Sequence, residues 1–247
     1  MSNIAKVLKT IKDKEIKFVD LRFTDTKGKW QHTAQTSTTI DEKTFKDGIM
    51  FDGSSIAGWK NINESDMILM PDPSTAVLDP FTAQPSLILF CDVIEPADGK
   101  PYELDPRSTG KKAEAYLKSS GIGEKCFFGP EAEFFIFDDV KWATDQEYTF
   151  FSIDSEEGAY NTGTEMEGGN MGHRPKDKGG YFPVPPVDSA TDIRAEMVST
   201  MTEMGIEMEK HHHEVAPSQH ELGFKFGSLI ESADNLQKYK YCVHMVA

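Results

Sequence analysis

Two glutamates in one apolar segment constrain the fold of this chain more than any other feature. The segment GPEAEFFIF (129–137) has the length of a strand, and Glu131 and Glu133 lie two positions apart within it. Side chains two apart on a strand point to the same face, with Cα atoms roughly 6.6 Å apart. The apolar neighbours predict burial, and an unpaired buried carboxylate is costly. The segment is therefore either an edge strand with one hydrated face or part of a cation site.

A second acidic segment favours the cation site. The sequence HHHEVAPSQHEL (211–222) predicts a tight hairpin, because Pro217 suits the first corner of a turn. If the loop consists of Pro217 and Ser218 alone, Glu214 faces Glu221 directly across the strand pair. Like charges in that position destabilise a hairpin, and a cation between them removes the repulsion. A longer loop would separate the two carboxylates.

Four glutamates on two strand segments predict a hard divalent ion, Mg²⁺ or Mn²⁺, because zinc prefers more His or Cys ligands. The adjacent run 211–213 consists of three histidines, of which only alternate members share a face of an extended strand. A structural or supporting role for this run is therefore favoured over direct ligation. The net charge of −15, from 26 basic and 41 acidic residues, agrees with cation binding and argues against nucleic acid or an anionic membrane as partner.

A polar turn lies between two aromatic residues in FDGSSIAGW (51–59). Asp52 followed by glycine is typical of a structural turn, so chemistry alone does not favour a catalytic Asp52. The stretch Thr109 to Lys112 superficially resembles a phosphate-binding loop. It lacks the required first glycine and the hydroxyl residue after the lysine, which excludes that interpretation.

The order of patterns predicts an α+β chain with a boundary near residue 104, which gives domains 1–104 and 105–247. Alternating apolar residues, turns and helical spacing predict the following elements: a helix within 1–16; strands at 19–23, 30–36, 67–70 and 87–93; a helix at 107–119; a strand at 126–137; a helix at 189–204 capped by Ser189 and Asp192; strands at 206–215 and 220–226; and a helix from Asp234 onward. The glycine-rich stretch 151–187 predicts either a functional loop or disorder.

Cysteine usage and hydropathy indicate the compartment. Three scattered cysteines without a CxxC pair fit a reducing cytosol, where we expect all three to be small buried residues. No apolar run approaches the ~18 residues of a membrane span, and residues 1–16 contain no continuous apolar stretch of a secretory signal. We therefore expect a cytoplasmic protein. The last helical pattern continues to Ala247 without a closing Gly or Pro, which suggests the front portion of a longer protein.

Four segments together resemble the type I glutamine synthetases: FDGSSIAGW (51–59), GPEAEFF (129–135), KGGYFPVPPVD (178–188) and HHHEVAPSQHEL (211–222). Their order and spacing fit over essentially the whole chain. The resemblance implies a small N-terminal β-grasp-like sheet domain, followed by the first part of a catalytic α/β domain with an antiparallel sheet. The family is longer than this chain.

The resemblance also implies a reaction. Members of the family are ATP-dependent ligases that form L-glutamine from L-glutamate and ammonia through a γ-glutamyl phosphate, with two Mg²⁺ or Mn²⁺ ions per site. By resemblance, Glu133, Glu214 and Glu221 hold one ion and Glu131 holds the other. ATP is a substrate, and Glu209 and Phe226 match positions near it.

Asp52 resembles the family residue that takes a proton from ammonium. Ser55, Tyr181 and Glu214 match positions that line the ammonium pocket. In the family the loop containing Asp52 reaches into the site of a neighbouring subunit. The resemblance therefore implies a ring-shaped homo-oligomer, a dodecamer of two stacked hexamers.

This chain departs from the family pattern in two respects. Ser218 stands where family members commonly have Gly, which we expect to alter only the turn. The family's remaining metal ligands, its substrate-binding arginines and its active-site flap would lie beyond Ala247, so we expect the chain alone to be inactive. Three alternatives stay open: a ligase that joins glutamate to a polyamine or other amine, a non-catalytic structural relative, and a simple divalent-metal-binding protein. The four glutamates oppose the second, and Asp52, Ser55 and Tyr181 favour ammonia over larger amines.

Overall fold

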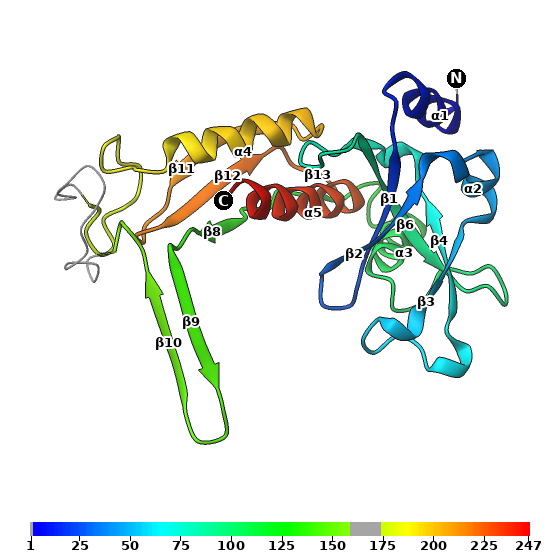
Figure 1. Cartoon of the computed structure of the whole chain (residues 1–247), viewed down its shortest axis with the longest axis horizontal. Helices are drawn as coiled ribbons and strands as arrows, with labels where there is room; N and C mark the ends of the chain where they lie inside the picture. Colours follow the sequence, from blue (N-terminus) through cyan, green and yellow to red (C-terminus); the bar gives the residue numbers. More distant parts are fainter. Residues whose placement is uncertain (1, 159–173) are drawn as a thin grey trace. The chain divides into compact units, whose positions relative to one another are not determined.

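The computed structural model describes residues 2–158 and 174–247 (Figure 1). Contacts divide the chain into two compact units, each assembled from two stretches. The first unit consists of Met1–Phe128 and Gly227–Gln237, and the second of Gly129–Phe226 and Lys238–Ala247. Part of the glycine-rich stretch, residues 159–173, lies outside the described residues. No described helix is long and apolar enough to cross a membrane.

A six-stranded mixed sheet forms the centre of the first unit, in the order β2-β1-β6-β4-β3 with β5 paired to β6. Its strands are β1 (Phe18–Thr24), β2 (Trp30–Thr36), β3 (Ile49–Asp52), β4 (Asp66–Pro71), β5 (Val77–Leu78) and β6 (Ser86–Ile94). The β1–β6 pair is parallel and the other pairs are antiparallel. The four strands expected in this region are confirmed.

The first strand is more deeply buried than its alternating sequence predicts. The apolar side chains of Val19 and Leu21 are fully buried, but Asp20 between them and Arg22 after them are buried as well. They are stabilised by ion pairs, because Arg22 Nε lies 2.6 Å from Asp20 Oδ2 and Arg22 Nη2 lies 2.9 Å from Asp79 Oδ2. Pairing of this kind is what allows charged groups inside a sheet domain.

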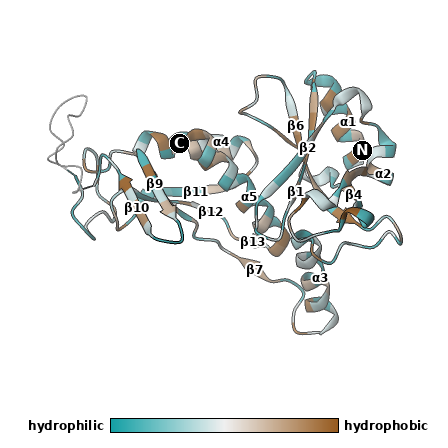
Figure 2. Ribbon diagram, turned by 60° about the horizontal axis from the view of Figure 1, so that its bottom comes forward, coloured by the Kyte–Doolittle hydropathy of each residue, from teal (hydrophilic) through white to brown (hydrophobic). Residues whose placement is uncertain are grey.

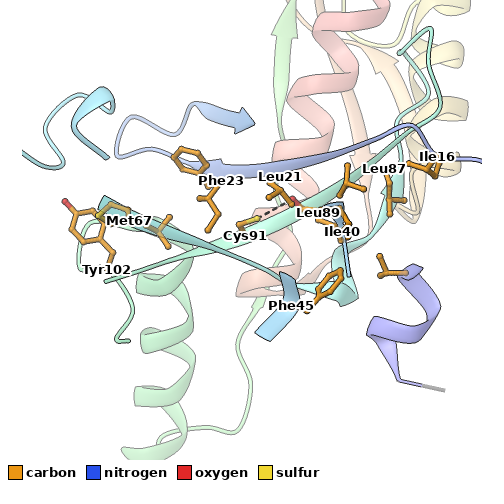
Figure 3. Packing of buried hydrophobic residues seen from close by; sticks show 14 of the residues in the cluster. Ile16, Leu21, Phe23, Ile40, Phe45, Met67, Leu87, Leu89, Cys91 and Tyr102 are labelled. Atoms are coloured by element: carbon orange, nitrogen blue, oxygen red, sulfur yellow. Dashed lines mark hydrogen bonds between the residues drawn. The ribbon is translucent and has the colours of Figure 1, made fainter. Parts of the chain in front are cut away.

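The core of the first unit lies against this sheet (Figure 3). Leu21, Leu87, Leu89 and Cys91 come from the neighbouring strands β1 and β6 and pack together in the close-up. Two short helices, α1 (Asn3–Asp13) and α2 (Glu42–Asp47), add Val7 and Phe45 to the same cluster. The expectation of three buried cysteines is wrong for Cys126, which is exposed, whereas Cys91 and Cys242 are buried.

The helix α3 (Pro106–Ser119) belongs to the first unit and begins at a buried cap. The carboxylate of Asp105 accepts hydrogen bonds from the backbone N–H groups of Arg107, Ser108 and Val93, at 3.1, 3.1 and 3.2 Å. It therefore satisfies the orphan donors of the helix start and also ties the helix to β6.

Arg107 is the centre of a three-carboxylate ion cluster in the same unit. Its guanidinium lies 2.9 Å from Asp72, 2.7 Å from Asp92 and 2.9 Å from Asp234, and its side chain is 9% exposed. The last partner lies inside α5 (Leu229–Val246), so the expectation that Asp234 begins the final helix is wrong. The carboxylate is an ion-pair partner of Arg107 and not a helix cap.

The second unit contains a three-stranded antiparallel sheet in the order β11-β12-β8. Its strands are β8 (Glu133–Phe135), β11 (Met208–His213) and β12 (Gln219–Phe224), accompanied by α4 (Thr191–Glu203) and the hairpin β9 (Asp139–Thr144) with β10 (Thr149–Asp154). The strand expected over 126–137 is interrupted: β7 (Phe127–Phe128) pairs with β13 (Gly227–Ser228) in the first unit, and only β8 pairs with β12. Mixed helices and sheets confirm the α+β class.

The helix α4 packs through a methionine face, as expected. Met197 and Met201 are fully buried, and Met204 just after the helix is nearly so. The expected cap by Ser189 and Asp192 is wrong, because no side chain caps the helix start at Ala190. The hydroxyl of Ser189 bonds Glu157 instead.

The Arg107 cluster generates a stability prediction. Replacing Arg107 by Ala leaves three partly buried carboxylates without their counter-charge, so we expect a loss of about 3–5 kcal/mol in the free energy of unfolding. The matched control is Lys9→Ala, which breaks the exposed Lys9–Asp13 pair of α1 and should cost at most about 1 kcal/mol. Urea unfolding followed by tryptophan fluorescence measures both. Equal losses in the two variants would contradict the importance of the cluster.

Candidate metal centre

Three strands in register place charged side chains in one row on the sheet of the second unit. His212 of β11 pairs with Glu221 of β12, and Glu221 pairs with Glu133 of β8. Directly paired residues point to the same face of a sheet. His212 Nε2 accordingly lies 3.4 Å from Glu221 Oε2.

Glu214 joins this row from the turn that follows β11. Its Oε1 lies 3.5 Å from His212 Nδ1. One ligand atom from each of His212, Glu214 and Glu221 lies within 4.8 Å of the other two, a spacing that allows all three to hold one metal ion. The sequence predicted that Glu214 and Glu221 come together, and the structure brings them together.

The turn that brings these two carboxylates together is longer than the expected two-residue loop. The N–H of Glu214 donates to the carbonyl of Gln219 at 2.7 Å, and the N–H of Gln219 donates to the carbonyl of Ala216 at 3.2 Å. The turn therefore contains four residues, 215–218, and Glu214 lies opposite Gln219. The expectation that Glu214 faces Glu221 across the ladder is wrong. The two carboxylates approach each other because Glu214 lies beyond the last residue of β11, where the chain enters the turn.

The last residue of this turn, Ser218, has a backbone conformation that favours the glycine common in the family. Its φ is +66°, in the left-handed region that glycine adopts without strain and other residues adopt at a cost. Glycine is thus the least strained residue at this position. Serine occupies it with a buried hydroxyl that is hydrogen-bonded to the hydroxyl of Ser155.

The three side chains of the cluster are buried, and two of them are carboxylates. Glu214 and Glu221 are 8% and 6% exposed, and His212 is 9% exposed. Within the described part of the chain, His212 Nε2 has no hydrogen-bond partner. The exposed Lys210 places its Nζ 3.7 Å from Glu221 Oε1. Two carboxylates and an imidazole nitrogen fit the preferences of Mn²⁺ and are compatible with Mg²⁺.

His212 is the ligand candidate that the sequence interpretation ranked low. The alternation argument holds, because His211 and His213 interact elsewhere. His211 Nδ1 lies 3.4 Å from Arg194 Nε, and His213 Nε2 lies 2.7 Å from Glu157 Oε2. Only the middle histidine of the run faces the two glutamates.

The burial expected for Glu131 and Glu133 is wrong. Both are exposed, and Glu131 lies outside the short strand β8. Glu133 accepts a hydrogen bond from Gln219 Nε2. Since β8 is the edge of its sheet, solvent reaches these carboxylates and no cation is needed to explain them. The buried carboxylates of this region that approach each other are Glu214 and Glu221.

An aromatic pair lies against the cluster. Tyr181 stacks on Phe182 with ring centroids 4.0 Å apart, and both rings present themselves edge-on to His212, at 5.7 and 4.6 Å. The close approach requires Gly180, because a Cβ there would lie 2.6 Å from the carbonyl oxygen of Glu214. Tyr181 is 55% exposed, so it borders the cluster and remains accessible.

Asp52 and Ser55 lie in the first unit, at the end of β3. Asp52 accepts hydrogen bonds from Ser54 Oγ at 2.6 Å, Ser54 N at 2.8 Å and Ser55 Oγ at 3.3 Å. The hydrogen bonds from Ser54 are the main cause of a lowered pKa of Asp52. Asp52 is thus an exposed, ionised carboxylate, and Ser54 is a supporting residue that the sequence interpretation missed.

Glu209 and Phe226 lie towards the end of the β11–β12 hairpin that is farther from the turn. Glu209 is exposed at an irregularity of β11 and lines a shallow hollow with Gly205 and Lys225. Phe226, just after β12, is 58% exposed. The structure leaves both accessible, and their proposed proximity to ATP stays a prediction.

A buried polar network on the opposite side of the β11–β12 pair was not identified from the sequence. Burial disfavours ionisation of Glu157, but hydrogen bonds from His213, Ser189 and Ser218 outweigh it and lower its pKa to about 2. Burial and the nearby guanidinium of Arg194 lower the pKa of His220 to about 4. Glu157 follows a strand in an irregular segment, where no periodic pattern predicts a buried carboxylate.

Comparisons with known proteins agree with the geometry. The family model described as "Glutamine synthetase, catalytic domain" matches residues 103–247, and "Glutamine synthetase, beta-Grasp domain" matches residues 15–96. Glutamine synthetases of Rhizobium meliloti (strain 1021) and Azospirillum brasilense are 60% and 61% identical over 100% of this chain and 53% of their own length. The chain therefore spans about half the length of these relatives.

A solved structure agrees as well. The cryo-EM structure of Plasmodium falciparum glutamine synthetase matches with a TM-score of 0.88 at 28% identity, over 100% of this chain and 49% of that one. The two family models together cover nearly all of the sequence, and the fold matches the β-grasp and catalytic architecture that the resemblance implied. The chain belongs to the glutamine synthetase family.

Proposed function

We propose that this chain contributes the ammonium-binding loop and part of the metal centre of an ATP-dependent ligase that forms L-glutamine from L-glutamate and ammonia through γ-glutamyl phosphate. Family membership supports the reaction class. The observation that carries the proposal is the buried cluster of His212, Glu214 and Glu221, whose donors suit a divalent ion. Its domains are proposed as 1–104 and 105–247.

The metal role follows from the donor chemistry. Bound Mg²⁺ or Mn²⁺ supplies neutralisation of phosphate charge and alignment of the phosphoryl donor. We assign Glu133, Glu214 and Glu221 to one ion and Glu131 to a second ion. We add His212 to the first set because its Nε2 lies 3.4 Å from Glu221 Oε2 and has no hydrogen-bond partner among the described residues. The exposed ring of Phe226 and the exposed carboxylate of Glu209 are assigned to ATP.

The ammonium role follows from charge. Asp52 is ionised at neutral pH and exposed, so it attracts NH₄⁺, and it is the proposed acceptor of the ammonium proton. Its lowered pKa favours attraction of the cation more than it favours proton acceptance. Ser55, Tyr181 and Glu214 are the other proposed pocket residues, and Tyr181 and Glu214 both border His212.

Self-association into a ring-shaped homo-oligomer, a dodecamer, is part of the proposal. The ribbon of the hairpin β9–β10 contains hydrophobic positions (Figure 2), and exposed aromatic side chains there support an interface. Trp142 is 71% exposed and Phe151 is 77% exposed, and the two residues pair directly across the hairpin. Rings of this size left in water are typical of interaction surfaces. The free cysteines support a cytoplasmic location.

Removal of either buried glutamate should weaken metal binding. We expect Glu214→Gln and Glu221→Gln to reduce Mn²⁺ affinity at least about ten-fold in calorimetric titrations, whereas the exposed control Glu203→Gln should not change it. The same two variants should raise the melting temperature of the metal-free chain, because each relieves repulsion between buried carboxylates. ATP should strengthen Mn²⁺ binding. Unchanged affinity in both variants would exclude this metal site.

Asp52 should be needed for the use of ammonia. In the complete product of the gene that encodes residues 1–247, we expect Asp52→Ala to lower kcat with ammonia by roughly 10²–10⁴-fold, the usual size of an acid–base contribution. Asp47→Asn, which changes an exposed acid of α2, is the control. ATP turnover measured with ammonia and with polyamines distinguishes the amine-ligase alternative, which predicts faster turnover with the amine.

The 247-residue chain by itself should form no glutamine. The chain spans about half the length of its relatives. Among the metal ligands, it contains those that we assign to Glu131, Glu133, His212, Glu214 and Glu221. Incubation of the purified chain with glutamate, ammonia, ATP and Mn²⁺, followed by chromatographic detection of glutamine, measures this. Formation of glutamine at a rate above that of a heat-denatured sample would show that the chain is sufficient.

A further inference from the structure

Glu157 is a buried carboxylate that the proposed mechanism does not use. It lies in the segment that follows β10, is 5% exposed and accepts three hydrogen bonds. The donors are His213 Nε2 at 2.7 Å, Ser189 Oγ at 2.7 Å and the backbone N–H of Ser218 at 2.5 Å. These donors belong to the end of β11, the approach to α4 and the β11–β12 turn, so one carboxylate joins three separate segments.

The bond to Ser218 acts on the turn between two proposed ligands. Ser218 has a φ of +66°, a conformation that a serine does not prefer. Its N–H is held by Glu157 and its hydroxyl by Ser155. The turn begins directly after Glu214 and ends three residues before Glu221. Its shape therefore determines how closely these two carboxylates approach.

The bond to His213 acts on the end of β11. The side chain of His213 is buried on the face opposite to that of His212, because neighbouring strand residues alternate. His213 Nδ1 lies 2.7 Å from the carbonyl oxygen of Gly180 and 2.6 Å from that of Glu214, while Nε2 faces Glu157. Both ring nitrogens are engaged, and the contact with the carbonyl of Glu214 ties the ring to the backbone where β11 enters the turn.

We propose that Glu157 is a positioning residue for the metal centre: by holding the Ser218 turn and the His213 ring, it keeps Glu214 and Glu221 converged on His212. The proposal rests on the metal site of the proposed function. Glu157 itself is not a ligand, since its carboxylate is engaged by His213, Ser189 and Ser218.

Two substitutions separate hydrogen bonding from charge. Glu157→Ala removes all three bonds. Glu157→Gln removes the charge but can keep the bonds, because the amide oxygen can replace Oε2 toward Ser218 and His213 while the amide NH₂ donates to Ser189 Oγ. A matched control in the first unit is Asp105→Ala, which also removes a buried carboxylate that accepts backbone N–H groups.

The experiment measures Mn²⁺ affinity of the 247-residue chain by calorimetry, with melting temperatures recorded in parallel. We expect Glu157→Ala to weaken Mn²⁺ binding about 10–100-fold, the usual effect of losing an outer residue that orients ligands. Glu157→Gln should stay within about three-fold of the original chain. Asp105→Ala should lower the melting temperature and leave the affinity within about two-fold.

A second-site variant keeps the test decisive if Glu157→Ala is too unstable to purify. Glycine adopts φ near +66° without strain, so Ser218→Gly should reduce the dependence of the turn on Glu157. We expect the double variant Glu157→Ala/Ser218→Gly to fold and to recover a large part of the lost affinity. If Ser218→Gly improves neither the folding nor the Mn²⁺ affinity of Glu157→Ala, Glu157 does not position the ligands through the turn.

Unchanged affinity in Glu157→Ala overturns the positioning role, and an equal loss in Glu157→Gln shows that charge and not geometry is responsible, which also overturns it. A loss in Asp105→Ala as large as that in Glu157→Ala shows general destabilisation and overturns it as well. If the original chain does not bind Mn²⁺, or if Glu221→Gln binds it equally well, the metal site itself fails and this inference fails with it.

Discussion

The arrangement of the second unit depends on two buried carboxylates that approach one buried imidazole. Glu214 and Glu221 are almost removed from water, and Nε2 of His212 lies 3.4 Å from Glu221 Oε2 without a hydrogen bond to any described residue. Such crowding is unfavourable without a positive charge of adequate size. Two sets of contacts hold this unfavourable geometry in place. The rings of Tyr181 and Phe182 pack against His212, and the hydrogen bonds of Glu157 act from the opposite face of the sheet.

Two arginines of the first unit are paired with aspartates. Arg107 is surrounded by three aspartates, and Arg22 lies between Asp20 and Asp79, so positive and negative groups are matched within the fold. In the second unit Arg194 is likewise paired with Asp188, but Glu214 and Glu221 approach each other beside His212 and the exposed Lys210. This difference supports the proposed metal site.

Local patterns predicted most elements, and pairing between distant segments explains what they missed. Alternation and turn residues were sufficient for the β1–β2 hairpin, and helical spacing was sufficient for the methionine face of α4. The interruption of the strand over 126–137 could not be predicted, because it depends on which distant strands pair with each half. For the site, the sequence indicated that Glu214 and Glu221 come together but not the turn geometry by which they meet, and their role as metal ligands stays a prediction. No local sequence pattern indicates a role for Glu157, since its importance arises from three hydrogen-bond donors on other segments.

The four-residue turn after β11 is followed by a strand in which the position of Glu221 depends on exact spacing. Because strand faces alternate at every residue, one position inserted or deleted between Gln219 and Glu221 would send Glu221 to the wrong side of the sheet while most of the surrounding sequence stayed intact. The register of β12 therefore determines whether Glu221 shares a face with His212. The turn before it is less strict, since it contains a serine at a φ of +66°.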